Sequence, residues 1–163
     1  VVLSEQFVPK EEKYSGYAIC PGDDVFMVGR FLTHEGNQRN TPSVRFGNVA
    51  MLPLEPIYNE KRGLSQESFL VEMHSLPGYS GSPVFVYDHH VRMWEQKYMQ
   101  VGIRLLGIDW CHLSTYEPVL EKDSENRFEK INGQFVRSNT GMAGVVPAWK
   151  LKELLNSEEV KDD

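Results

Sequence analysis

Cysteine is scarce in this chain of 163 residues, which excludes stabilisation by several disulfides or by a cysteine-rich zinc site. Cys20 and Cys111 are too few and too widely spaced for a disulfide framework or a zinc ribbon. Each stands beside an apolar, strand-like run, so we expect two buried thiols, with a single bridge between them as the less favoured interpretation. Unbridged thiols favour a reducing compartment such as the cytoplasm, and the sequence gives no further indication of localisation.

Long apolar runs and concentrated positive charge are also missing. No stretch is long enough to cross a bilayer, and no signal peptide opens the chain. The formal net charge is −6, and the 17 Lys and Arg residues are scattered, so there is no electrostatic footprint for nucleic acid. We therefore predict neither a nucleic-acid nor a membrane partner for a chain whose 40% hydrophobic content can fill one core.

Short apolar runs separated by turn residues are typical of an all-β chain folded as an antiparallel β-barrel or as a β-sandwich. A single helix is expected after Pro147, where Leu151, Leu154 and Leu155 repeat at helical spacing, and we expect it to pack across the back of the barrel. Two charged segments without a regular apolar period are predicted to be long loops, at 55–67 and 112–140. The expected strands are 16–20, 24–32, 44–52, 69–74, 83–87, 101–108 and 142–146.

The most informative segment is Pro77-Gly78-Tyr79-Ser80-Gly81-Ser82-Pro83-Val84-Phe85, which places a serine between two glycines and leads into an apolar strand. A hydroxyl attacks a carbonyl when it is exposed and close to backbone N–H groups that receive the developing oxyanion. We predict Ser80 as the nucleophile, with the N–H groups of Gly78 and Ser80 forming the oxyanion hole. The alternative is an ordinary Gly/Ser/Pro turn between two strands.

This segment resembles the nucleophile turn of trypsin-like serine peptidases of the chymotrypsin fold, nearer their bacterial members than the digestive ones. Three further stretches are similar to parts of that fold's second barrel: residues 21–29 to its opening strand, 105–110 to the strand after the nucleophile, and 141–155 to the final strand and closing helix. The resemblance implies a trypsin-like C-terminal β-barrel over residues 16–156, preceded by the end of another region at 1–15 and followed by a charged tail at 157–163.

The catalytic His and Asp that such a peptidase requires are not found upstream of Ser80 in the family's setting. The only upstream histidine, His34, lies in a polar stretch and is better explained as a solvated loop residue. The other four histidines, His74, His89, His90 and His112, fall within the second barrel by this resemblance. Because the chain also opens on the apolar run Val1-Val2-Leu3, we expect a C-terminal portion whose N-terminal barrel, with the His and Asp, lies elsewhere.

The resemblance also indicates a substrate pocket. Its floor corresponds to His74, six residues before the nucleophile, and its walls to the segments that contain Asp109, Trp110, Gly141 and Gly144. Tyr79 departs from the acidic or Asn residue common at its position, so the salt bridge of the digestive enzymes is not available to hold the turn. Neither a metal nor an organic cofactor is expected, because triad chemistry needs none.

The sequence therefore predicts a serine endopeptidase acting on peptide or protein substrates through Ser80, inactive alone because its base is missing. Two alternatives remain: a peptide-binding or regulatory module derived from such a peptidase, and a β-barrel interaction domain whose Gly-Tyr-Ser-Gly turn is coincidental.

Overall fold

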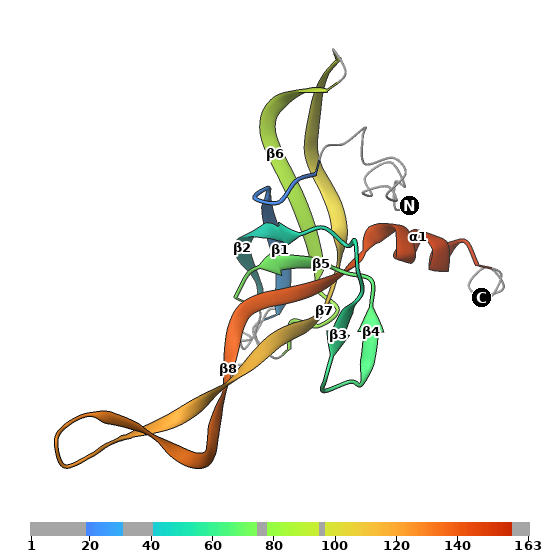
Figure 1. Cartoon of the computed structure of the whole chain (residues 1–163). Coiled ribbons are helices and arrows are strands. Elements are labelled where there is room, and N and C mark those ends of the chain that lie inside the picture. The colour runs from blue at the N-terminus through green and yellow to red at the C-terminus, as the bar shows by residue number, and fades with distance from the viewer. Residues whose placement is uncertain (1–18, 31–40, 75–77, 95–96, 158–163) are drawn as a thin grey trace.

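The computed structural model describes residues 19–30, 41–74, 78–94 and 97–157, of which 88–94 and 97–101 are described by their backbone alone. Six antiparallel strands form the barrel, and their ladder order β1-β2-β5-β8-β7-β6 closes because β1 also pairs with β6 (Figure 1). These strands are β1 (Asp24–Arg30), β2 (Pro42–Met51), β5 (Phe69–Glu72), β6 (Pro83–Trp94), β7 (Lys97–Lys122) and β8 (Phe128–Pro147). The predicted antiparallel β-barrel with a C-terminal helix is confirmed.

The core consists of apolar side chains at alternate positions of the barrel strands, which point into the barrel. In β1, Val25 and Met27 are fully buried, and the aromatic ring of Phe26 lies on the outer face stacked on Phe85, with ring centroids 5.1 Å apart. Since successive side chains of a strand point to opposite faces, this period-two pattern fixes which face of each strand turns inward. The other strands contribute Val49, Phe69, Val71, Val84, Val86, Leu106, Ala143 and Val145 to the same cluster.

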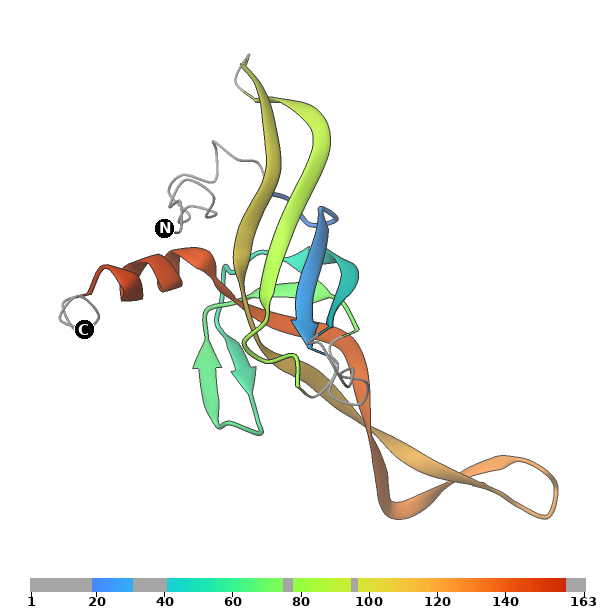
Figure 2. The ribbon, with the colours of Figure 1, turned by 180° about the vertical axis from the view of Figure 1, so that it is seen from behind.

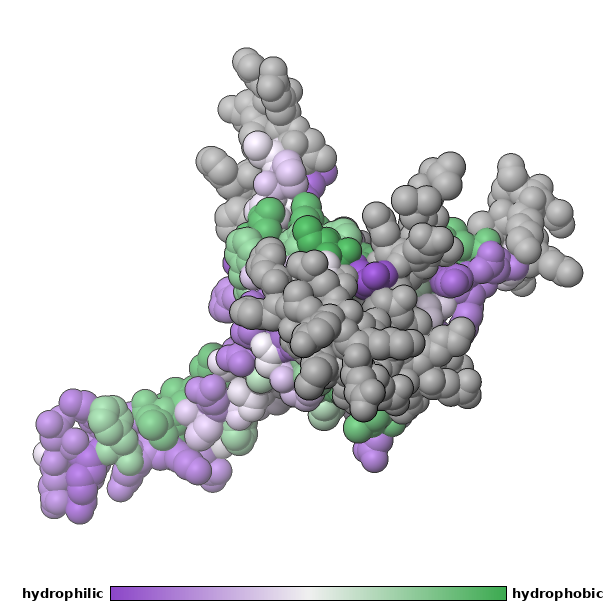
Figure 3. All heavy atoms as spheres, turned by 90° about the horizontal axis from the view of Figure 1, so that it is seen from above, coloured by the Kyte–Doolittle hydropathy of each residue, from purple (hydrophilic) through white to green (hydrophobic). Residues whose placement is uncertain are grey.

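The predicted loop at 112–140 is wrong: this segment is the outer half of a β-ribbon. Strands β7 and β8 continue beyond the barrel and pair from Ser114↔Asn139 out to Lys122↔Phe128, forming an arm that leaves the barrel in Figures 1 and 2. The pairing satisfies the backbone hydrogen-bonding groups of the arm without burying either of its faces. Its sequence therefore shows no alternation of apolar and polar residues. Figure 3 shows apolar atoms exposed along the arm and a hydrophilic tip.

The predicted loop at 55–67 is also wrong, because it contains a short hairpin. Strands β3 (Ile57–Asn59) and β4 (Leu64–Gln66) pair antiparallel as a separate two-stranded sheet. Their turn is closed by Asn59, whose backbone and side-chain oxygens accept hydrogen bonds from the Arg62 N–H at 3.2 and 3.0 Å. The hairpin lies beside β7 and β8 in both ribbon views.

The single described helix, α1 (Ala148–Leu155), begins after Pro147 as predicted, but it does not pack along its length. Only Ala148 and Trp149 are buried, whereas Leu154 and Leu155 are 54% and 43% exposed. The expected packing of the helix on the barrel is therefore limited to its first turn, where Trp149 belongs to the core cluster and its ring contacts that of Phe69. No described helix is long and apolar enough to span a membrane.

Several expectations fall wholly or partly outside the described residues. These are His34, the strand ends at 16–18 and 31–32, the region 1–15 and most of the tail at 157–163. Ile19 and Cys20, the described end of the first predicted strand, are not in a strand. Cys111 is buried as predicted, but Cys20 is exposed because it precedes the turn into β1, and no disulfide joins the two.

Candidate functional site

The predicted nucleophile lies on a sharp turn between the described end of β5 and the start of β6. Gly78 and Gly81 adopt positive φ values of 102° and 93°, which residues with a Cβ rarely adopt. Two hydrogen bonds fix the second half of the turn: the Gly81 N–H donates to the Asp109 carbonyl at 2.7 Å, and the Ser82 N–H donates to the Tyr79 carbonyl at 2.9 Å. Between them Ser80 is exposed.

The amides on either side of Tyr79 are not used by the fold. Among the described residues, neither the Gly78 N–H nor the Ser80 N–H donates a hydrogen bond, although the neighbouring Gly81 and Ser82 amides both do. Gly78 and Ser80 line the same cavity, of about 290 Å³. An exposed serine hydroxyl and two available N–H donors therefore border one space.

Tyr79 anchors this turn from inside the barrel. Its side chain is fully buried, and its hydroxyl is hydrogen-bonded to the Ser43 hydroxyl on β2 at 2.5 Å. The Arg45 guanidinium lies 4.9 Å from the centroid of its ring. A Cβ on Gly29 would come within 2.5 Å of the ring, so this glycine of β1 leaves the space that the ring fills. An aromatic anchor thus stands where the family pattern has an acidic or Asn residue.

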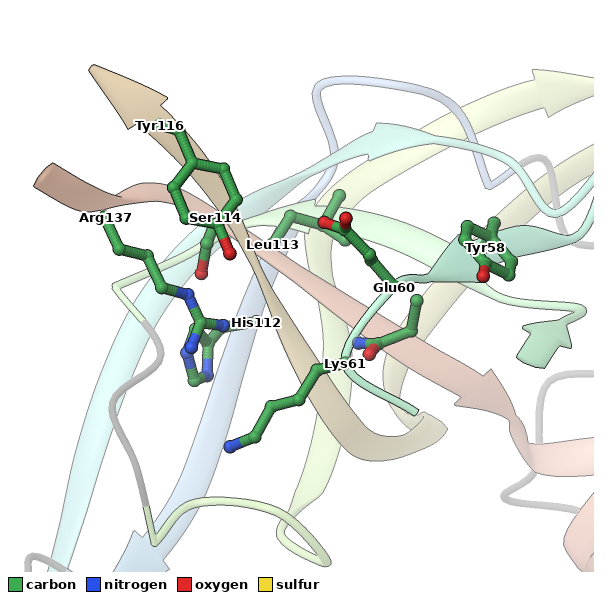
Figure 4. Close-up of a pocket in the computed structure, with 9 residues that line it drawn as sticks. Tyr58, Glu60, Lys61, His112, Leu113, Ser114, Tyr116 and Arg137 are labelled. Carbon is green, nitrogen blue, oxygen red and sulfur yellow. The ribbon is translucent and has the colours of Figure 1, made fainter. Parts of the chain in front are cut away.

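The cavity beside Ser80 is lined largely by polar and cationic groups from two hairpins. Lys61 and Arg62 come from the turn between β3 and β4, and Arg137 comes from the arm. A neighbouring hollow of about 500 Å³ shares Lys61, His112 and Arg137 with it. Figure 4 shows the Arg137 guanidinium beside the His112 ring and the Lys61 amine extending toward the same side.

Asn59 ties the cationic turn to β7. Asn59 is buried, and its side chain is hydrogen-bonded both to the Arg62 N–H and to the Cys111 thiol. Burial raises the pKa of the Cys111 thiol, while its hydrogen bonds to Asn59 and to the Gly144 backbone lower it. The buried thiol is thus held protonated and serves as a contact rather than as a nucleophile.

Trp110 forms the wall between this cavity and the barrel. Its indole N–H donates to the Ser68 hydroxyl at 2.8 Å, and the Arg62 guanidinium lies 5.5 Å from its ring centroid. A Cβ on Gly144 would come within 2.8 Å of the indole nitrogen and 2.9 Å of the Cys111 sulfur, so Gly144 makes room for both side chains. Trp110 and Gly144, which were predicted to lie on two walls of the substrate pocket, are therefore in direct contact.

The other predicted pocket residues do not border this cavity. His74 is exposed at the end of β5, next to Met73, whose N–H donates to the Gly141 carbonyl at 2.7 Å. Asp109 is 1% exposed and belongs to the barrel interior. Trp110 alone among the predicted pocket residues lines the cavity together with Ser80.

No described histidine is hydrogen-bonded to the Ser80 hydroxyl. His112 lines the same cavity, but its described charged neighbours are Arg137 and Lys61 rather than a carboxylate that would orient it as a base. Burial lowers the pKa of His112, and the two cations lower it further, so the ring is neutral near pH 7. No cluster of His, Cys, Asp or Glu suited to a metal occurs in the described part of the chain.

The sequence did not indicate Asn59, Lys61, Arg62, His112 or Arg137 as site residues. They lie in the two segments that were predicted as loops, each of which is a hairpin in the structure, and residues from both hairpins line one cavity. No family model matches the chain, and no curated protein or solved structure does.

Proposed function

We propose that the chain is the C-terminal barrel of a trypsin-like serine endopeptidase that cleaves peptide bonds by acyl transfer through Ser80. The observation that carries the proposal is the exposed Ser80 hydroxyl on one cavity with the N–H groups of Gly78 and Ser80, which have no described acceptor. Amides that a fold leaves without acceptors are suited to bind an oxygen that becomes negative during a reaction.

In this proposal, the Ser80 oxygen attacks the scissile carbonyl carbon, and the electron pair of the carbonyl moves to its oxygen. The Gly78 and Ser80 N–H groups donate hydrogen bonds to that oxyanion. Collapse of the intermediate expels the amine, leaving an acyl group on Ser80 that water then removes. The proton from Ser80 goes to a general base, which passes it to the leaving amine.

The edge of β7 offers a place for the substrate backbone next to Ser80. Strand β6 pairs with β7 as far as Pro83↔Ile108, and the nucleophile turn continues this contact at Asp109. From Trp110 onward, the only strand that pairs with β7 in the described residues is β8. An extended peptide added to this edge would gain main-chain hydrogen bonds while its carbonyl lies near the turn.

We assign the base and its orienting acid to an N-terminal barrel outside these 163 residues, as the resemblance implies. Without them Ser80 is a weakly nucleophilic alcohol, and only the oxyanion site and substrate binding contribute, which in serine proteases amounts to roughly a thousandfold over water. The chain alone is therefore expected to be nearly inactive. The proposed chemistry requires no metal or organic cofactor.

A second candidate is a non-catalytic peptide-binding module built on the same barrel. It is favoured by one observation: within the described residues, neither histidine nor carboxylate is hydrogen-bonded to the Ser80 hydroxyl. In that case the cleft would grip an extended peptide without cutting it.

Fluorophosphonate labelling of the parent protein that contains this chain separates the two candidates. Covalent labelling that disappears in Ser80→Ala and persists in Ser114→Ala, a serine of the neighbouring hollow, would support the peptidase. Labelling that persists in Ser80→Ala would remove Ser80 from the mechanism. No labelling of the parent protein, together with peptide binding to it, would favour the binding module.

A further inference from the structure

The cavity beside Ser80 concentrates positive charge on an otherwise acidic chain. Lys61, Arg62 and Arg137 line it, although the formal net charge of the protein is −6. All three residues are exposed, and none of them forms an ion pair with a carboxylate among the described residues. Their charge is therefore available to a ligand.

Two acidic residues that are adjacent in sequence to residues of the cavity lining, Glu60 and Asp109, do not neutralise this cluster. Glu60 lines the neighbouring hollow, but Figure 4 shows its carboxylate directed toward Leu113 and away from the Lys61 amine. Asp109 is buried and does not line the cavity. The lowered pKa of His112 agrees with this arrangement, because the charges of Arg137 and Lys61 add to the effect of burial.

The fold holds these cations in place. Asn59 closes the turn that carries Lys61 and Arg62, and the Arg62 guanidinium lies over the Trp110 ring. Arg137 is opposite Tyr116 in the ladder of the arm, so its backbone position is set by the pairing of β7 with β8. Cations positioned before binding lose less conformational freedom when a ligand arrives.

From this arrangement we infer that the site selects peptides with an acidic side chain next to the segment that lies beside Ser80. The inference rests on the proposed function, because it takes the cavity at Ser80 as the peptide site and names its substrate class. Guanidinium groups bind carboxylates through two parallel hydrogen bonds, and the ammonium of Lys61 adds a further positive charge on the same cavity. A basic peptide would be repelled by the same three cations.

The test compares peptides that differ only in one residue. Short peptides with a neutral fluorophore carry Glu, Gln or Lys at a single position that is moved along an otherwise uncharged sequence, and their dissociation constants for the 163-residue chain are measured by fluorescence anisotropy. At the best position we expect the Glu peptide to bind about tenfold more tightly than the Gln peptide, and the preference to shrink as salt screens the exposed cations.

Arg137→Gln and Lys130→Gln form a matched pair of variants, because both remove one exposed positive charge from β8 and only Arg137 lines the cavity. We expect Arg137→Gln to abolish most of the Glu preference without weakening the Gln peptide, and Lys130→Gln to leave both affinities unchanged. Circular dichroism checks that each variant is folded, and Lys61→Gln provides a second variant at the site.

Equal affinity for Glu and Gln peptides at every position would overturn the inference, and so would a loss of preference as large in Lys130→Gln as in Arg137→Gln. These outcomes are distinct from a failure of the proposed function, which is read from covalent labelling at Ser80. Labelling without an acidic preference would refute only the inference, whereas a Glu preference at this cavity without labelling would support it on a binding module.

Discussion

The hydrogen bond between the Tyr79 and Ser43 hydroxyls should contribute measurably to the stability of the turn that carries Ser80. The Ser43 hydroxyl also donates to the Gly29 carbonyl at 3.3 Å, so the Tyr79 phenol is the donor in the 2.5 Å contact. Tyr79→Phe removes this bond but leaves Ser43 its carbonyl acceptor, which should lower the free energy of unfolding by about 1 kcal/mol. Ser43→Ala leaves the phenol buried without its acceptor, which should cost about 2 kcal/mol.

The double variant distinguishes a shared interaction from two separate effects. In the double variant no buried hydroxyl is left without an acceptor, so the double variant should lose no more stability than Ser43→Ala. The interaction free energy between the two substitutions should therefore be about 1 kcal/mol. Urea unfolding followed by tryptophan fluorescence measures all four proteins. Additivity of the two single effects within about 0.3 kcal/mol, or a larger loss for Tyr79→Phe than for Ser43→Ala, would refute the reasoning.

Three further predictions concern other parts of the fold. Gly107→Ala should prevent folding or lower the free energy of unfolding by several kcal/mol, because the added Cβ would overlap the Val146 carbonyl oxygen. Gly133→Asn is its control: Gly133 has a φ of 76° and open space around it, so this substitution should lower the free energy of unfolding, measured in urea, by less than about 1 kcal/mol. NMR titration should give His112 a pKa below 6.5, which should rise in Arg137→Gln but stay lowered by burial. Because the folded state favours the neutral ring, the protein should lose stability as the pH falls below the pKa of the histidine in the unfolded state. The pKa of Asp123 should lie below 3.8, because backbone and side-chain hydrogen bonds from Arg127 and a backbone hydrogen bond from Glu125 favour its carboxylate. The tip of the arm should therefore lose order, seen as chemical-shift changes in these residues, as the pH falls below 3.8 and through that lowered pKa.

The barrel was predictable because its strands bury one face. Runs such as 24–30 and 83–87 alternate or concentrate apolar residues between turn signals, and the structure confirms a strand at each. The glycines of the nucleophile turn were equally informative, since positions 78 and 81 need backbone conformations that other residues resist.

The arm and the cationic lining of the cavity were not predictable from periodicity. In the arm, Phe128 and Phe135 are 67% and 62% exposed, so no buried face imposes alternation on its sequence. One local signal was present: the turn from Asp123 to Arg127, in which Asn126 has a φ of 64° and the Asp123 carboxylate accepts two backbone N–H groups, is typical of a hairpin tip. Lys61 and Arg137 are 76 positions apart, and only tertiary pairing brings them to one cavity.

The join between β1 and β6 is one of the two shortest seams of the barrel; the other, between β2 and β5, also has three pairs but joins segments much closer along the chain. Three described residue pairs close it, Val25↔Val86, Phe26↔Phe85 and Met27↔Val84, while the ladder between β7 and β8 runs the length of the barrel and on into the arm. The seam also unites segments that are distant along the chain, so its closure entropy is greater than that of any hairpin. Thermal opening of the cylinder should therefore start at this seam, and Tyr79, which packs against Gly29 at the end of β1, would be released with it.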